Sequence, residues 1–157
     1  MVPFAGYEMP VQYQGIIAEH LACRNGAALF DVSHMGQAAL TDAAALEKLV
    51  PGDITGLKPG KQRYTLLTNA AGGIIDDLMV ANLGTRFQLV LNASRKRIDL
   101  DHLAAHGVQA SEFPDRALLA LQGPAAVAVL GRLAPEVKVL PFMTAATHKL
   151  EIGRAHV

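Results

Sequence analysis

The sequence predicts an α+β fold in which helices pack on one face of an open antiparallel sheet. Three strands are expected in close succession, at residues 62–68, 74–83 and 86–93, because each is rich in apolar and β-branched side chains. The connections between them, residues 69–73 and the Gly84-Thr85 pair, have the composition of hairpin turns. Helical segments precede and follow this block instead of alternating with its strands, which favours α+β over α/β.

The remaining elements are predicted from hydrophobic periodicity and from residues that begin or end helices. Thr41 and Asp42 are candidate N-caps of a short helix that Pro51-Gly52 stops after Val50. Asn25-Gly26 weakens the end of the first helix. The other expected elements are a helix at 15–29 with Ile17, Leu21 and Ala28 on one face, an extended segment at 30–40, a helix at 94–106 with Leu100, Leu103 and Ala104 on one face, a buried strand at 117–121 and a helix at 124–133.

The composition is that of a globular chain with its own core. Of the 157 residues, 51% are hydrophobic and 18% are charged, which excludes a disordered chain. The 14 basic residues balance the 14 acidic ones, so nothing suggests a nucleic-acid or anionic-membrane partner. No apolar run is long enough to span a membrane. The single cysteine, Cys23, cannot form a disulfide within the chain and fits a reducing compartment.

An acid pair, Asp76-Asp77, lies in the middle of the second predicted strand. Because alternate side chains of a strand share a face, Asp76 falls in the row of Ile74, Leu78 and Val80, and Asp77 in the row of Ile75, Met79 and Ala81. Aspartate is disfavoured in strands, and a carboxylate in an apolar row must find donors or suffer desolvation. One interpretation is a functional site. The other is that one aspartate faces solvent and its neighbour caps a backbone N–H, and the residues alone leave both open.

The predicted hairpin brings a polar partner to Asp77. If Gly84-Thr85 is a two-residue turn, Leu83 faces Arg86, and continuing the pairing places Asp77 opposite Asn92 and Met79 opposite Val90. An acid, an amide and apolar side chains on one patch suit a flat, partly polar heterocycle. Tyr64, on the preceding strand, is a further candidate for this face, although the longer loop leaves its register open.

Other polar residues are weaker candidates. His102 and His106 have metal-ligand spacing, but the glutamate of an H-E-x-x-H motif is absent, so a solvated helix face that also carries Arg95 and Asp99 is the favoured interpretation. His34 could act as an acid or base, but a hydrogen-bonded structural histidine is the commoner case. No metal site is expected.

Several segments in order resemble one family. They are VPFAGYEMPVQY, FDVSHMGQ, LVPGDI, YTLLTNAAGGIIDDLMV, LALQGP and LPFM, within residues 2–146. Together they resemble the glycine cleavage T-protein, or aminomethyltransferase, family. The resemblance implies a folate-binding fold and transfer of the methylene carbon from the aminomethyl-lipoyl arm of H-protein to tetrahydrofolate, with release of ammonia.

The resemblance also implies roles for particular residues. Asp77 matches the second aspartate of the family's IDDL motif, which contacts the reactive edge of the folate and orients or activates its nitrogen. Met35, Tyr64, Val90 and Asn92 match positions that line the pterin pocket. The implied co-substrate is tetrahydrofolate, without a metal, and the implied partner is lipoylated H-protein. The expected location is the bacterial cytoplasm, or the mitochondrial matrix in a eukaryote.

Two other functions of the same superfamily remain as alternatives: a folate-dependent demethylase and a non-catalytic folate-binding module. The family's later GYTGEDG segment, its glutamate and its two folate-binding arginines have no counterpart here. We therefore expect residues 1–150 to be an N-terminal folate-binding region truncated at both ends and inactive alone. Residues 151–157 are expected to be a non-native tail, because their back-translation resembles a sequencing-library adapter.

Overall fold

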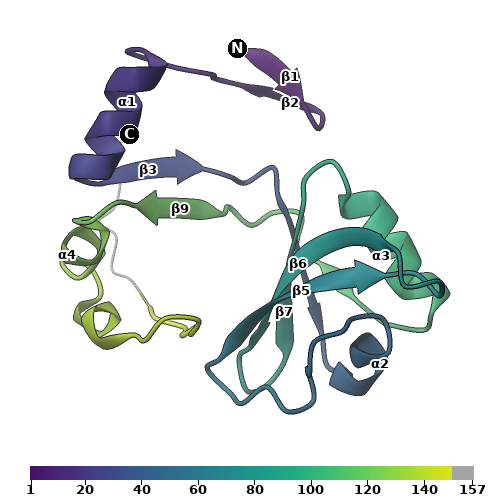
Figure 1. The fold of residues 1–157 in the computed structure, drawn as a ribbon. Helices are drawn as coiled ribbons and strands as arrows, with labels where there is room; N and C mark the ends of the chain where they lie inside the picture. The colour runs from purple at the N-terminus through teal and green to yellow at the C-terminus, as the bar shows by residue number, and fades with distance from the viewer. Residues whose placement is uncertain (150–157) are drawn as a thin grey trace. The chain divides into compact units, whose positions relative to one another are not determined.

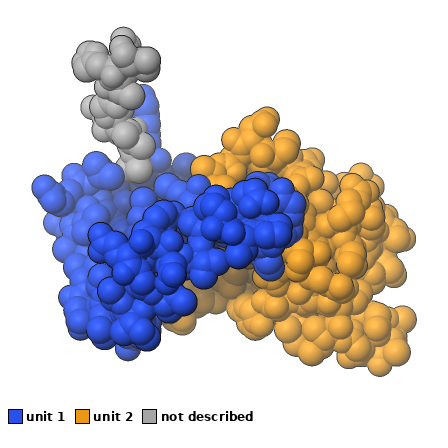
Figure 2. All heavy atoms as spheres, turned by 90° about the horizontal axis from the view of Figure 1, so that it is seen from above, with its two compact units in different colours: residues 1–32, 119–141, 147–157 blue, residues 33–118, 142–146 orange. Residues whose placement is uncertain are grey.

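The computed structural model describes residues 1–149, and the predicted non-native tail lies outside them. The chain forms two compact units (Figure 2). Unit 1 contains residues 1–32, 119–141 and 147–149 of the part that the structure describes. Unit 2 contains residues 33–118 and 142–146, and includes the three predicted hairpin strands and the acid pair.

Unit 2 is built on a five-stranded antiparallel sheet with the strand order β5-β6-β7-β4-β8. Figure 1 labels three of its strands, β5, β6 and β7. Two helices belong to this unit, α2 (Ala43–Glu47) and α3 (Lys96–Ala105). The three predicted strands are confirmed nearly to the residue, and the α+β class is confirmed with them. The strands are β4 (Gly36–Leu40), β5 (Gln62–Thr68), β6 (Ile74–Asn82), β7 (Phe87–Leu91) and β8 (Ser111–Glu112).

The turn between β6 and β7 fixes the register of these two strands. Gly84 has φ +85°, Thr85 is not among the residues with positive φ, and the Leu83 N–H donates to Arg86 O at 2.9 Å. This is the conformation of the predicted type II′ turn. The pairing runs from Asn82 opposite Phe87 to Leu78 opposite Leu91, as the sequence predicted.

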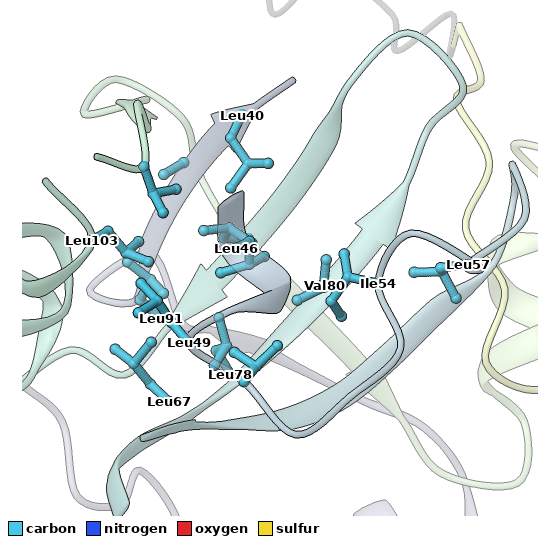
Figure 3. Close-up of a cluster of buried hydrophobic side chains, with 14 residues drawn as sticks. Leu40, Leu46, Leu49, Ile54, Leu57, Leu67, Leu78, Val80, Leu91 and Leu103 are labelled. Atoms are coloured by element: carbon cyan, nitrogen blue, oxygen red, sulfur yellow. The ribbon is translucent and has the colours of Figure 1, made fainter. Parts of the chain in front are cut away.

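One face of this sheet carries the core of unit 2. Leu78 and Val80 of β6 point to that face and are buried with Leu67 and Leu91 of the neighbouring strands. Figure 3 shows Leu46 of α2 and Leu103 of α3 in the same cluster, so both helices cover one face of the sheet as expected. The helix α2 begins where predicted, because the Asp42 side chain accepts a hydrogen bond from the Ala45 N–H at 3.0 Å. The opposite face of the sheet is left for the candidate site.

Unit 1 contains two short two-stranded ladders and three helical segments. Strand β3 pairs with β9, although the two are far apart in the sequence. The elements are β1 (Val2–Phe4), β2 (Tyr7–Met9), α1 (Ile16–Asn25), β3 (Ala28–Asp31), β9 (Leu119–Gln122), α4 (Ala126–Leu130) and the 3-10 helix η1 (Pro135–Val139).

Several predicted boundaries around unit 1 were wrong. The first helix ends at Asn25 instead of continuing to Leu29, because residues 28–31 form β3. The extended segment predicted at 30–40 is two strands separated by a turn, and the last helix is shorter than expected. Gly123, which follows β9, lies very close to backbone atoms of another segment. A Cβ there would lie 2.4 Å from the carbonyl oxygens of Cys23 and Gly26, and its φ of +108° also favours glycine.

Only part of the apolar stripe predicted for the first helix lies on α1, because Ala28 belongs to β3, and that part is exposed. Ile17 is 71% exposed and Leu21 51% exposed, and α1 buries none of its residues. Within residues 1–149, none of the helices is both long and apolar enough to cross a membrane.

Candidate active site on the open face of the sheet

The open face of the sheet brings the predicted site residues together in two neighbouring rows. One row runs across β5, β6 and β7 through Tyr64, Met79 and Val90, which are paired strand to strand. Directly opposite residues in antiparallel strands share a face and lie close together. The next row begins with Leu66 opposite Asp77. Leu78 pairs with Leu91, and the next residues outward on the two strands are Asp77 and Asn92. The row therefore continues from Asp77 to Asn92.

Asp77 is held from two sides. The Asn92 Nδ2 donates to Asp77 Oδ1 at 3.1 Å and to the Asp77 carbonyl oxygen at 3.2 Å. This confirms the predicted neighbourhood of Asp77 and Asn92. The carboxylate has thus found a donor while staying half-exposed on the open face. Because a carboxylate has about four acceptor positions, Asp77 keeps capacity for donors of a ligand.

Tyr64 supplies the second contact. Its side chain is 56% exposed, and its hydroxyl forms a hydrogen bond with the Asp77 side chain. Partial desolvation, then the negative charge of Asp77 and the hydrogen bond to it, raise the pKa of the Tyr64 phenol above its ordinary value. The phenol therefore stays protonated and donates to Asp77.

Met35 directly precedes β4. It lies in the bend before Gly36, which pairs with Leu91. The five residues expected at the site therefore come from β5, β6, the end of β7 and the residue before β4. The half-exposed side chains of Met79 and Val90 add an apolar floor beside the polar row.

A β-bulge lies next to the acid pair. Leu67 pairs with Asp76 but Thr68 pairs with Ile74, so Ile75 is an extra residue in β6. Bulges increase the local twist and re-aim side chains, and they occur often beside active sites. Here both aspartates reach the same amide, because Asn92 Nδ2 also donates to Asp76 Oδ1 at 3.1 Å.

Asp76 and Asp77 nevertheless have different surroundings. Asp77 contacts Tyr64 on the open face, whereas the second carboxyl oxygen of Asp76 is buried and accepts no hydrogen bond from the residues that the structure describes. The alternative in which one aspartate faces solvent and the other caps a backbone N–H is not what the structure shows. Both accept from the Asn92 side chain.

Asp99 is the residue that the sequence interpretation misplaced. It was expected on a solvated face of the helix, but it is 1% exposed. The available signal was its position four residues before Leu103, which is fully buried, since residues four apart share a helix face. Burial first, and then the hydrogen bond and negative charge of Asp76, raise the pKa of Asp99 from its ordinary 3.8 to about 7.

The weaker candidates Arg95, His102 and His106 make contacts within the protein. Arg95 is not simply solvated, because its Nη2 donates to the Ile75 carbonyl oxygen at 3.0 Å. His106 Nδ1 lies 2.8 Å from His102 O, and the two rings are tilted by 44° with their centroids 4.3 Å apart. Among residues 1–149, no three His, Cys, Asp or Glu side chains gather where they could hold a metal ion.

Comparison with known proteins identifies the family of this chain. The family described as the GCVT N-terminal domain matches residues 1–157. The chain is 43% identical over 150 residues to an aminomethyltransferase of Prochlorococcus marinus, covering 87% of this chain and 40% of that one. It is 44% identical over 139 residues to an aminomethyltransferase of Deinococcus deserti, covering 83% of this chain and 39% of that one.

A solved structure is similar in fold as well as in sequence. It is the glycine cleavage system aminomethyltransferase T from Bartonella henselae, with a TM-score of 0.86 and 38% identity. The match covers 92% of this chain and 42% of that one.

Fold and site together define an α+β domain with a carboxylate held on the open face of an antiparallel sheet. The chain belongs to the GCVT N-terminal domain family, the family of the glycine cleavage T-protein. It spans about 40% of the length of the curated relatives that it matches.

Proposed function

We propose that this chain supplies the folate side of an aminomethyltransferase of the glycine cleavage system. The reaction is transfer of the methylene carbon from aminomethyl-lipoyl H-protein to tetrahydrofolate, with release of ammonia. The observation that carries the proposal is Asp77, oriented by Asn92 and Tyr64 on an open, partly apolar face in a chain whose relatives are aminomethyltransferases.

The residues present fit a reduced pterin. Its heterocycle is flat and carries N–H donors along one edge, and a carboxylate with spare acceptor positions pairs with such donors. The side chains of Met79 and Val90 offer apolar surface for the ring, and both lie in the row next to Asp77. A mostly apolar surface with a few placed polar groups is typical of cofactor sites.

Each residue then has a definite task. Bound tetrahydrofolate would supply the amine nitrogens that accept the methylene carbon. Asp77 would accept a hydrogen bond from the folate, orient it, and stabilise positive charge near the reacting nitrogen. Asn92 keeps the Asp77 carboxylate in one orientation through Oδ1, and the Tyr64 hydroxyl donates to the same carboxylate. A charge-bearing group held in advance in this way does not have to reorganise during the reaction.

The direct test uses the protein at the full length that its gene encodes. Asp77→Asn should reduce methylenetetrahydrofolate formation from aminomethylated H-protein by about 10²- to 10⁴-fold, the usual contribution of a placed acid or base. The matched control is Asp101→Asn. Asp101 lies on α3, is exposed, and pairs with Arg97 away from the site, so this variant should keep full turnover.

Two other outcomes identify the alternatives. Binding of tetrahydrofolate without turnover with H-protein would indicate a non-catalytic folate-binding module. Folate-dependent oxidation of an N-methyl substrate, with no response to H-protein, would indicate a demethylase. Either result would overturn the proposal.

A further inference from the structure

Two arginines and a phenylalanine of unit 2 form a cationic cluster. Phe113 directly follows β8, and its N–H donates to the Gln37 carbonyl oxygen at 2.8 Å. The guanidinium carbon of Arg116 lies 3.9 Å from the centre of the Phe113 ring. The guanidinium carbon of Arg86, which directly precedes β7, lies 5.7 Å from the same centre. Both distances are those of cation–π contacts, so one ring holds two positive charges from separate segments.

The cluster belongs to the same face of the sheet as Asp77. Gln37 pairs with Val90, and directly opposite residues share a face, so the Gln37 side chain lies on the open face. Its Nε2 donates to the carbonyl oxygens of Arg116 and Ala117 at 3.2 and 3.3 Å. These two bonds hold the segment after β8 over the open face, and they fix where the Arg116 side chain begins.

Both guanidinium groups keep their hydrogen-bond donors. In the part of the chain that the structure describes, Arg86 and Arg116 form no ion pair and no side-chain hydrogen bond. A guanidinium that stacks on an aromatic ring still has its N–H groups pointing outward in its own plane. In contrast, Lys96 and Arg97 of α3 each pair with a carboxylate. The cluster therefore offers positive charge and free donors to an anion.

The distance from Asp77 to the cluster suits the length of one folate molecule. The strand order places β8 three strands away from β6, which is roughly 14 Å at about 4.8 Å per strand. In tetrahydrofolate an aminobenzoyl ring and a glutamate follow the pterin. About ten bonds of about 1.4 Å join the nitrogen that bears this ring to the γ-carboxylate, and they reach roughly 12 Å when extended. The half-exposed Val90 of β7 offers apolar surface along this path.

We propose that Arg86 and Arg116 bind the glutamate carboxylates of the tetrahydrofolate whose pterin pairs with Asp77. This inference rests on the proposed function, because it names a second contact of the same ligand. A guanidinium can donate two parallel N–H bonds to one carboxylate. The bound anion also offsets the repulsion between the two cations that Phe113 holds. Since the glutamate does not change in the reaction, these arginines contribute to binding and not to the chemical step.

The test compares two ligands that differ in the tail. They are tetrahydrofolate and the N-methylamide of tetrahydropteroate, which keeps the pterin, the aminobenzoyl ring and the amide but lacks both glutamate carboxylates. Anaerobic titration calorimetry on the protein at its full genomic length should show tetrahydrofolate binding about 10-fold or more tightly than the amide. Added salt should reduce this preference. In the double variant Arg86→Gln/Arg116→Gln the preference should disappear, while the Kd of the amide stays within about twofold of the wild-type value.

Kinetics and a control variant give independent readouts. In the glutamine double variant KM for tetrahydrofolate should rise by about 10-fold, and kcat should stay within a few-fold, because binding shared by the ground and transition states is lost. Arg97→Gln is the matched control, since Arg97 is exposed and pairs with Asp101 on α3. This variant should keep the wild-type preference for tetrahydrofolate over the amide.

The outcomes separate this inference from the proposed function. A wild-type preference in the glutamine double variant, or an equal loss of affinity for both ligands, would overturn the binding of the tail by Arg86 and Arg116. The proposed function stands in either case if the wild-type protein forms methylenetetrahydrofolate from aminomethylated H-protein. If the wild-type protein binds neither ligand, the proposed function fails and this inference fails with it.

Discussion

At the scale of single residues, the neighbours Asp76 and Asp77 have separate tasks. Asp77 contacts Tyr64 on the open face, while the second carboxyl oxygen of Asp76 is buried. We therefore expect Asp77→Asn to reduce turnover by orders of magnitude with little change in the free energy of unfolding. Asp76→Asn should cost much less turnover. Steady-state kinetics and chemical denaturation of both variants check this, and a larger catalytic loss in Asp76→Asn would contradict the assignment.

Asp99 should make the stability of the chain depend on pH. Its pKa is raised from 3.8 to about 7 in the folded state, so the folded chain binds more protons than the unfolded chain between these values. The contribution of Asp99 to the free energy of unfolding should therefore be most favourable near pH 4 and below, and should fall as the pH rises to 7, by at most about 1.4 kcal/mol per pH unit.

Asp99→Asn provides the comparison for this pH dependence. The asparagine cannot titrate, so the difference in free energy of unfolding between wild type and variant should change across pH 4–7 and stay constant above that range. Urea denaturation at several pH values measures it. A constant difference over the whole range would show that Asp99 titrates like an ordinary aspartate.

At the scale of elements, the two-residue turn between β6 and β7 is important for the geometry of the site. It sets the register that places Asp77 next to Asn92. Gly84 has φ +85°, and a Cβ there would meet no atom within 4 Å, so a side chain is opposed only by the backbone conformation. Gly84→Ala should lower the free energy of unfolding by about 1–2 kcal/mol.

Thr85→Ala is the matched control for the turn, since Thr85 is not among the residues with positive φ. It should change the free energy of unfolding by only about 0.5 kcal/mol or less, as surface substitutions usually do. Thermal or urea denaturation of both variants gives the comparison. Equal effects at the two positions would show that the glycine conformation does not matter.

The elements that the sequence predicted well are those whose structure depends on residues close together in the sequence. Alternation of apolar residues and a two-residue turn sufficed for β5, β6 and β7, and through them for the grouping of Asp77, Asn92 and Val90. The end of α1 was missed because β3 forms only with β9, a segment far along the chain. The burial of Asp99 was likewise missed, because it depends on how α3 packs against the sheet.

At the scale of the whole molecule, the length of the relatives limits what this chain can do alone. It spans about 40% of the curated relatives that it matches, and α1 exposes the apolar side chains of Ile17 and Leu21. We expect the 157-residue chain by itself to show no methylenetetrahydrofolate formation with aminomethylated H-protein. Turnover close to that of a complete relative, in an assay at equal protein concentration, would contradict this expectation.

The pairing of β3 with β9 also affects the order in which parts of the chain can fold during synthesis. The hairpins of β5, β6 and β7 join segments that leave the ribosome one after another, and hairpins close within microseconds. Residues 28–31 must instead wait for residues 119–122. At about 5–20 residues per second this wait is on the order of several seconds. During that interval Leu29 and Phe30 have no strand to pair with, so the hairpins of unit 2 can form before the β3–β9 ladder of unit 1.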